Sequence, residues 1–226
     1  RYRVRYRYSG NLLVNHSTLL NSDPEYPDFS RQRNFFVNWS HQVDPGASLT
    51  ERFSASVNLG TSNNYRNNFN SSTANYLSNT FQSNISYTRL WPGRPFSLSV
   101  NALHRQNTIN RTFDITLPAI NFNLQRILPI QMLRPVGALP RWYDQLALTY
   151  TANLDNKLST TEERLYLENI PALAGQASNG MKHTAALTST FTNRFFSVNP
   201  EFRFTDRWYL ETLRRTYLSA QDTVVS

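Results

Sequence analysis

The sequence predicts an all-β fold: an antiparallel wall of about nine strands, part of a transmembrane β-barrel too large for these residues to close. Three observations predict this class. Apolar side chains occur singly and alternate with Asn, Ser, Thr and Arg, so the long aliphatic runs of a two-layer core are missing. Turn-forming residues interrupt the alternation repeatedly, and the connections differ in length. We therefore expect a sheet with one apolar and one polar face.

Period-two alternation defines the individual strands. It is clearest in 51–61, where Phe53 and Val57 alternate with Arg52 and Asn58. In the first segment, tyrosines alternate with arginines from the first residue onward. The predicted strands cover residues 1–15, 33–43, 51–61, 80–91, 95–106, 111–126, 144–156, 181–194 and 197–210. Within the sixth, Pro118 can donate no ladder hydrogen bond, which predicts a bulge or bend.

The connections between these strands differ in length in a roughly alternating order. Bacterial outer-membrane barrels alternate short periplasmic turns with longer extracellular loops. On this basis the short connections are predicted to face the periplasm, although 127–143 is longer than such a turn should be. The long connections are 16–32, 62–79 and 157–180, the medium ones 106–110 and 127–143, and the short ones 44–50, 92–95 and 195–197.

Composition narrows the function classes. The chain has no cysteine, so it can form neither a disulfide framework nor a thiolate metal site. No window approaches the ~20 apolar residues of a transmembrane helix. The chain starts at Arg1 inside a strand pattern with no signal peptide, so we expect residues 1–226 to be an internal part of a single barrel domain.

Polar residues in phase with the presumed inner face are the candidate functional residues. Two roles stay open for them: hydrogen bonding across strands and to water, or contact with a phosphorylated, anionic ligand in transit, which suits the planar guanidinium fork. The predicted lumen-facing residues are Arg3, Arg5, Asn38, Arg52, Asn58, Asn101 and Arg203.

Aromatic residues gather beside the predicted periplasmic turns. Amphipathic rings favour the headgroup level of a membrane, which predicts an aromatic girdle there. The alternative is that aromatics are simply frequent in β-strands. The predicted girdle consists of Trp91, Trp142, Tyr143, Phe195 and Phe196.

No catalytic arrangement is recognisable, so we expect no enzyme, no cofactor and no metal. The four histidines are far apart in sequence and lack the spacing of metal ligands. Glu162 and Glu163 lie in a polar loop and read as a solvated pair. The histidines are His16, His41, His104 and His183.

Several local patterns occur together in a specific order between about residues 30 and 210. They are Asn38-Trp39-Ser40-His41-Gln42 followed by Asp44-Pro45, then Phe53-Ser54-Ala55-Ser56-Val57-Asn58, Thr116-Leu117-Pro118, Phe122-Asn123-Leu124-Gln125-Arg126-Ile127-Leu128-Pro129, Arg141-Trp142-Tyr143, and Asn199-Pro200 before Arg207-Trp208-Tyr209. In these motifs the chain resembles the barrel region of the LptD-like lipopolysaccharide-assembly proteins of Bacteroidetes.

This resemblance implies a role in the last step of lipopolysaccharide export. A periplasmic jellyroll, absent from these residues, would pass the lipid to a large barrel that opens laterally into the outer leaflet. The implied location is the outer membrane of a Gram-negative bacterium. The implied partners are lipopolysaccharide, membrane lipids, periplasmic bridge proteins and, in some relatives, a plug lipoprotein.

Two other functions remain open at this level. Another outer-membrane transporter, such as a porin or a TonB-dependent receptor, would share the strand pattern. A soluble, basic all-β protein could use its Arg- and Tyr-rich strands to bind nucleic acid, since the net charge is +8. We expect no nucleic-acid partner, because nearly all the positive charge is Arg spread through strand-like segments.

Overall fold

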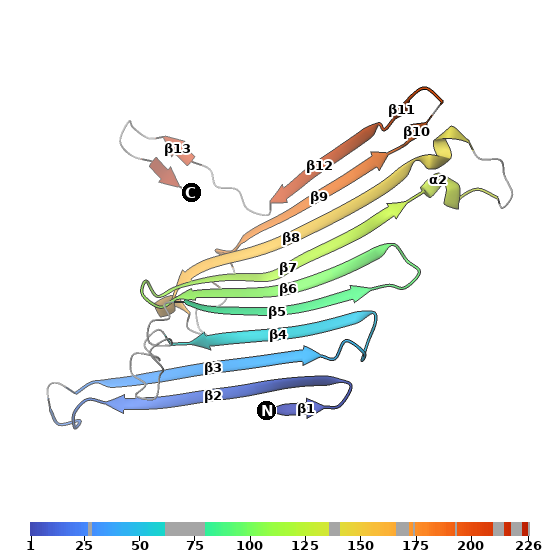
Figure 1. Ribbon diagram of the computed structural model, residues 1–226. Coiled ribbons are helices and arrows are strands. Elements are labelled where there is room, and N and C mark those ends of the chain that lie inside the picture. The colour runs from blue at the N-terminus through green and yellow to red at the C-terminus, as the bar shows by residue number, and fades with distance from the viewer. Residues whose placement is uncertain are drawn as a thin grey trace.

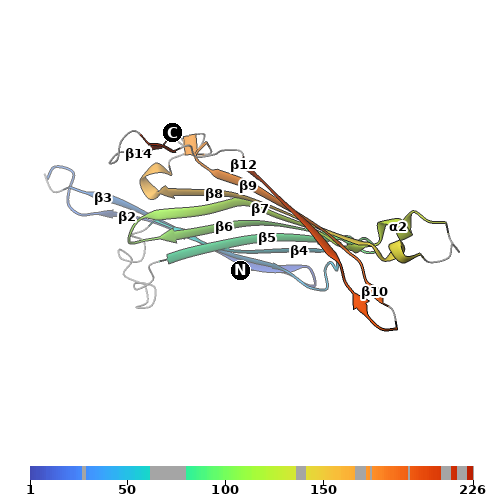
Figure 2. The same cartoon turned by 90° about the horizontal axis from the view of Figure 1, so that it is seen from above.

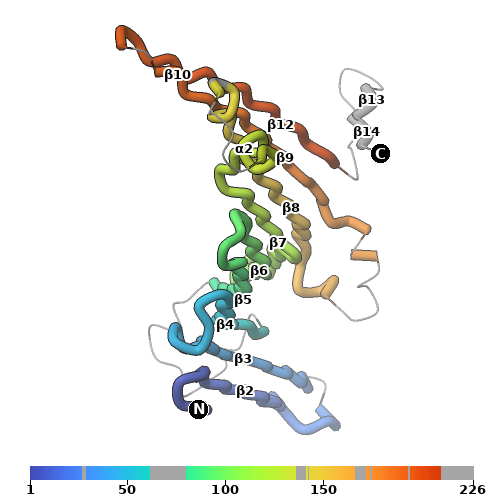
Figure 3. Tube along the Cα trace, turned by 90° about the vertical axis from the view of Figure 1, so that its right-hand side faces the viewer, coloured from blue at the N-terminus to red at the C-terminus, as the bar shows by residue number. Residues whose placement is uncertain are grey.

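The computed structural model describes residues 1–26, 29–61, 80–135, 141–165, 172–173, 175–192, 194–209, 215–217 and 223–225, with backbone only at 142, 215–217 and 223–225. This part of the chain forms one antiparallel sheet of ten strands in sequence order, with two small two-stranded sheets (Figure 1). The predicted all-β class is confirmed. The sheet remains open, with β1 and β12 at its two edges, as the view in Figure 3 shows.

The main sheet consists of β1 (Tyr2–Val4), β2 (Tyr8–Leu20), β3 (Arg31–Val43), β4 (Glu51–Gly60), β5 (Thr80–Leu90), β6 (Phe96–Asn107), β7 (Thr112–Ile127), β8 (Ala147–Thr161), β9 (Ser178–Thr188) and β12 (Glu201–Tyr209). The small sheets pair β10 (Phe191–Thr192) with β11 (Ser197–Val198), and β13 (Arg215–Tyr217) with β14 (Thr223–Val225). The helices described are the single turns α2 (Pro129–Met132), η1 (Trp142–Gln145) and η2 (Glu162–Arg164).

The prediction of one strand over 1–15 is wrong. The chain reverses after Val4, where the Arg7 amide donates to the Val4 carbonyl at 3.0 Å and Tyr6 takes a φ of 62°. The Tyr–Arg alternation continues through this turn without a glycine or proline, so the pattern concealed it. Because β2 then runs on to Leu20, the connection predicted over 16–32 shrinks to residues 21–30.

Three other strand boundaries also differ from prediction. The strand predicted over 144–156 starts later and ends later, because η1 occupies its first residues. The strand predicted over 181–194 is β9, which ends at Thr188. The strand predicted over 197–210 is β12, since β10 and β11 form a separate hairpin around the predicted 195–197 turn. This hairpin projects beyond the main sheet (Figure 2).

The bulge predicted at Pro118 is confirmed. Between Thr116 and Ala119, β7 carries one more residue than either neighbouring strand. An extra residue reverses the phase of a strand, because successive side chains point to opposite faces. Ile115 before the bulge and Ile120 after it therefore lie on the same, apolar face, opposite His104 and Val100 of β6.

The connections gather at the two ends of the sheet as antiparallel order requires. The predicted short turns 44–50 and 92–95 lie at the same end as the β10–β11 hairpin (Figure 1). The helical turns α2 and η1 are also there, and a contact between the Arg134 guanidinium and the Asp144 carboxylate joins η1 to the residue that follows α2 by two positions. The predicted loop 62–79 lies outside the described residues.

The largest fully buried side chains among the described residues lie at the opposite end of the strands. Phe81 and Gln106 are fully buried, and Phe81 packs against Phe36 with 5.9 Å between ring centroids. The Gln106 amide donates to the Gly60 carbonyl at 2.8 Å. These residues form a small buried cluster at one end of the sheet.

Candidate functional site

The two faces of the sheet have opposite chemistry along whole rows of side chains. We define a row as a set of residues that lie directly opposite one another on successive strands. All residues of a row share a face of the sheet. On one face, successive partners are Ser9, Gln42, Ser54, Ser86 and Asn101 of β2 to β6. On the other face, successive partners are Phe53, Tyr87, Val100, Ile120 and Leu154 of β4 to β8. We call these the polar face and the apolar face.

Six of the seven predicted lumen residues lie on the polar face, and the register places them there directly. The exception is Arg5, which lies in the turn between β1 and β2 and stacks over the Tyr6 ring at 5.2 Å. That these side chains face a lumen stays a prediction. The six are Arg3, Asn38, Arg52, Asn58, Asn101 and Arg203.

These six residues do not converge on one site. Asn38 and Asn58 are directly opposite each other on β3 and β4, while the other four lie on four different strands. Arg203 is neutralised locally, since its Nη2 lies 2.6 Å from a carboxylate oxygen of Glu201. The polar face is therefore an extended hydrogen-bonding surface and has no catalytic cluster among these residues.

A hollow of about 510 Å³ opens on the polar face between β7 and β12, and its basic residues are not among the predicted site residues. Lys182 of β9 and Arg207 of β12 line it and lie directly opposite each other. Alternation alone places Lys182 on the polar face. Its pairing with Arg207 requires the register between two strands, which the sequence pattern did not supply.

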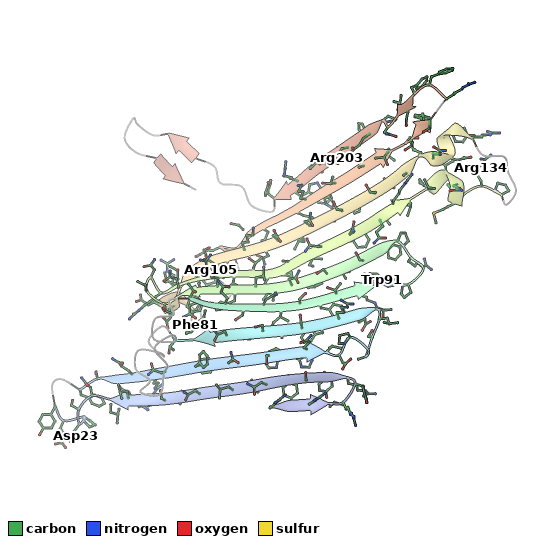
Figure 4. All side chains as sticks on the ribbon, in the orientation of Figure 1. Asp23, Phe81, Trp91, Arg105, Arg134 and Arg203 are labelled. Atoms are coloured by element: carbon green, nitrogen blue, oxygen red, sulfur yellow. The ribbon has the colours of Figure 1, made fainter. Side chains whose placement is uncertain are left out.

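The predicted girdle aromatics lie at the turn end of the sheet, as Trp91 shows in Figure 4. Three of them carry an arginine over the ring, at 5.3 Å for Arg89 on Trp91, 5.7 Å for Arg141 on Tyr143 and 5.9 Å for Arg194 on Phe195. Phe195 is 84% exposed and Phe196 58%. The Trp142 side chain lies outside the described residues. That these rings contact lipid headgroups stays a prediction.

The contact between Arg141 and Tyr143 also affects the pKa of the arginine. Arg141 donates a hydrogen bond to the Tyr143 hydroxyl, and this bond raises the pKa of Arg141 above its ordinary value. Arginine is already charged throughout the physiological range, so the bond holds a permanent cation beside the ring. Positive charge next to exposed aromatics is typical of protein surfaces that meet anionic lipid headgroups.

All four histidines lie on the apolar face, and in three of them Nδ1 lies close to a hydroxyl of another strand. His41 Nδ1 lies 2.7 Å from the Tyr2 hydroxyl, His104 Nδ1 lies 3.2 Å from Ser83 Oγ, and His183 Nδ1 lies 2.5 Å from the Tyr150 hydroxyl. A polar group on an apolar surface needs such a partner. Each of these three Nδ1 atoms therefore has its partner within the sheet. Within the described ranges, no cluster of three or more His, Asp or Glu is arranged to hold a metal.

The family model for LptD protein matches the chain over residues 1–226. The chain belongs to the LptD family. No curated protein and no solved structure matches it.

LptD proteins act in lipopolysaccharide transport at the outer membrane, and they are transporters, not enzymes. The match confirms the resemblance found in the sequence motifs; the phylum stays a prediction. The match is also consistent with the all-β antiparallel sheet. In the described part of this LptD chain, no helix is both long and apolar enough to cross a membrane.

Proposed function

We propose that this LptD-family chain forms part of the wall of an outer-membrane barrel that delivers lipopolysaccharide to the outer leaflet. In this proposal the polar face lines the lumen and meets the sugar headgroup, while the apolar face meets membrane lipids. The observation that carries the proposal is the unbroken row of polar side chains across five strands, next to apolar rows on the reverse face.

The separation of the two faces supports transfer of an amphiphile. A charged, hydroxylated headgroup needs a hydrogen-bonding path through the hydrocarbon layer, because unsatisfied polar groups there cost several kcal/mol each. Acyl chains need a seam to leave the barrel, which we assign to lateral opening between two strands elsewhere in the wall. Transfer makes and breaks no covalent bond, so the activity requires no catalytic residue.

The proposal also includes further components that this chain would work with. Periplasmic bridge proteins would supply the lipid, and a plug lipoprotein could occupy the lumen. A jellyroll domain and additional strands would complete the protein. The family match favours this function over a porin, a TonB-dependent receptor or a nucleic-acid-binding protein.

The matched positions Val100 and Asn101 test the proposal. They are neighbours on β6 but lie on opposite faces of the sheet, opposite Tyr87 and Ser86. In the full-length protein in growing cells, a photoreactive residue at 101 should capture lipopolysaccharide, and one at 100 should not. Depletion of the parent gene should lower surface lipopolysaccharide and accumulate it at the inner membrane. Unchanged surface lipopolysaccharide after depletion, or equal capture at both positions, contradicts the proposal.

A further inference from the structure

The hollow on the polar face is built by two adjacent rows of side chains. In the first row Asn121, Asn153, Lys182 and Arg207 face one another in turn across β7, β8, β9 and β12. In the second row, Gly180 lies between Asp155 and Tyr209. Because glycine has no side chain, this position leaves space in the middle of the sheet surface. The result is a hollow of about 510 Å³ with a basic, amide-rich rim.

Two like charges meet at this rim without a counter-ion. Lys182 and Arg207 are a directly opposite pair, an arrangement that destabilises a sheet. In the described part of the chain, neither side chain forms an ion pair. Lys157, which also lines the hollow, has the one carboxylate there, at 3.7 Å in Asp155. The hollow therefore holds three cations and one anion.

The carboxylate nearest to Arg207 in the sequence, that of Asp206, does not neutralise the Arg207 guanidinium. Asp206 precedes Arg207 but lies on the apolar face, opposite His183. Its two oxygens accept hydrogen bonds from the Arg207 backbone amide at 2.8 Å and from the Trp208 indole at 2.5 Å. Arg203 differs from Arg207, because Glu201 neutralises it on the same strand and the same face. Arg207 thus has no carboxylate partner of the kind that Glu201 provides for Arg203.

We propose that this hollow binds an anionic group, phosphate or carboxylate, carried by the sugar headgroup of a glycolipid. Arg207 offers a planar fork that matches both anions, and Lys182 adds a point charge. The amides of Asn121 and Asn153, in the same row, supply donors and acceptors for sugar hydroxyls. This inference rests on the proposed function, because it assigns a headgroup contact to the face that would line the lumen.

The dimensions and chemistry of the hollow favour a headgroup over a free ion. Small-molecule sites commonly measure about 300–1,000 Å³, so the hollow accommodates a sugar ring together with its charged substituent. A free phosphate would occupy only the Lys182–Arg207 side. The two asparagines, on β7 and β8, and the Tyr209 ring at the end of β12 would then have no role in binding.

The test uses the full-length protein with a photoreactive residue at Thr151. This position lies on β8 and on the polar face, one row from the hollow, opposite Asn123 and Thr184. Capture of lipopolysaccharide should fall roughly tenfold in the double variant Lys182→Gln with Arg207→Gln, because two charge-assisted hydrogen bonds are lost. The charge-preserving variant, Lys182→Arg with Arg207→Lys, should retain most of the capture. Arg33→Gln, an arginine on the apolar face of β3 opposite Thr18, is the control and should leave capture unchanged.

Three further readings decide between the sources of the anion. The intact headgroup oligosaccharide should reduce the capture of lipopolysaccharide at position 151. The same oligosaccharide without its phosphate and carboxylate groups should reduce this capture only weakly. Inorganic phosphate at the same concentration should leave it unchanged. Competition by inorganic phosphate alone overturns the glycolipid assignment. Equal capture by wild type and the double variant overturns the site itself.

Failure of the site and failure of the proposed function give different results. The anion site alone is wrong if position 101 captures lipopolysaccharide while capture at position 151 is the same in the wild type and in the double variant. If neither position captures lipopolysaccharide, the proposed function fails as well. Misfolding is excluded by heat-modifiable gel migration, which the double variant should retain because it removes a repulsive pair.

Discussion

The Tyr2 hydroxyl of β1 lies 2.7 Å from His41 Nδ1 and accepts a hydrogen bond from the Trp39 indole at 2.9 Å, so one phenol joins two polar groups of β3 on the apolar face. The Tyr2 ring also covers Gly10, which lies directly opposite on β2. An aromatic side chain over a glycine of the neighbouring strand shields backbone that would otherwise be exposed. The shortest strand of the main sheet is therefore held by its first side chain.

Removal of the Tyr2 hydroxyl should loosen this edge. Tyr2→Phe leaves the His41 and Trp39 nitrogens without their partner on the apolar face, which costs about 1–3 kcal/mol. Hydrogen exchange measured in lipid should show faster exchange of the β1 and β2 amides. Tyr8→Phe is the control, since Tyr8 packs at 5.4 Å from the His41 ring and forms no side-chain hydrogen bond among the described residues. Equal exchange in the two variants contradicts the role of the Tyr2 hydroxyl.

Arginine substitutions at neighbouring positions on the two faces should differ in how much they lower the stability of the folded protein. Val100→Arg places a cation among Tyr87 and Ile120 on the apolar face and should destabilise the folded protein by about 2–4 kcal/mol if that face meets hydrocarbon. Asn101→Arg, on the polar face, should change stability by less than about 0.5 kcal/mol. Urea unfolding of the full-length protein in lipid measures both. A similar loss in the two variants contradicts a lipid-facing apolar surface.

Much of the fold follows from the sequence because alternation is a local signal. Phe53 against Arg52 is visible within two residues, and it predicts the face of each without knowledge of any other strand. The same local signal failed to predict the turn between β1 and β2. Tyr6 continues the alternation while its backbone reverses direction, and no glycine or proline marks the change.

The candidate site was less predictable because it depends on register. Lys182 and Arg207 are well separated in the chain and become neighbours only through the pairing of β9 with β12. The polar-face location of Arg203 was accessible from its phase, but its neutralisation by Glu201 depends on side-chain geometry. Composition and phase identify a polar face; they do not identify which cations on it lack a partner.

Breaking the Asp144 contacts should release the connection between β7 and β8. Asp144 is buried, accepts a hydrogen bond from the Arg141 amide at 2.5 Å and contacts the Arg134 guanidinium, so it ties η1 to the residues after α2. Asp144→Asn should cost about 1–3 kcal/mol locally, since charge-assisted bonds are lost in a shielded place. Limited proteolysis should cut within 128–146 faster.

The matched control for Asp144 is an exposed ion pair at the same end of the sheet. Glu51 lies 3.6 Å from Arg89, and both side chains are nearly half exposed. Exposed pairs contribute about 0–1 kcal/mol, so Glu51→Gln should leave the cleavage rate unchanged. Acceleration of cleavage by both substitutions would point to a general effect of charge at this end and against a specific role for Asp144.

Two glycines at the loop end of the sheet should respond differently to alanine. At Gly60 an added Cβ would lie 2.8 Å from the Phe35 carbonyl oxygen and 3.0 Å from the Phe36 ring, and backbone cannot move aside cheaply. Gly60→Ala should therefore cost about 1–3 kcal/mol by overpacking.

At Gly180 the nearest atom to an added Cβ is 3.5 Å away, on the Tyr209 ring, which is ordinary contact. Gly180→Ala should keep stability within about 0.5 kcal/mol while it narrows the hollow, so unfolding in lipid should separate the two variants. A loss at Gly180 as large as that at Gly60 would show that the sheet tolerates no side chain there, and that the glycine serves packing as much as the hollow.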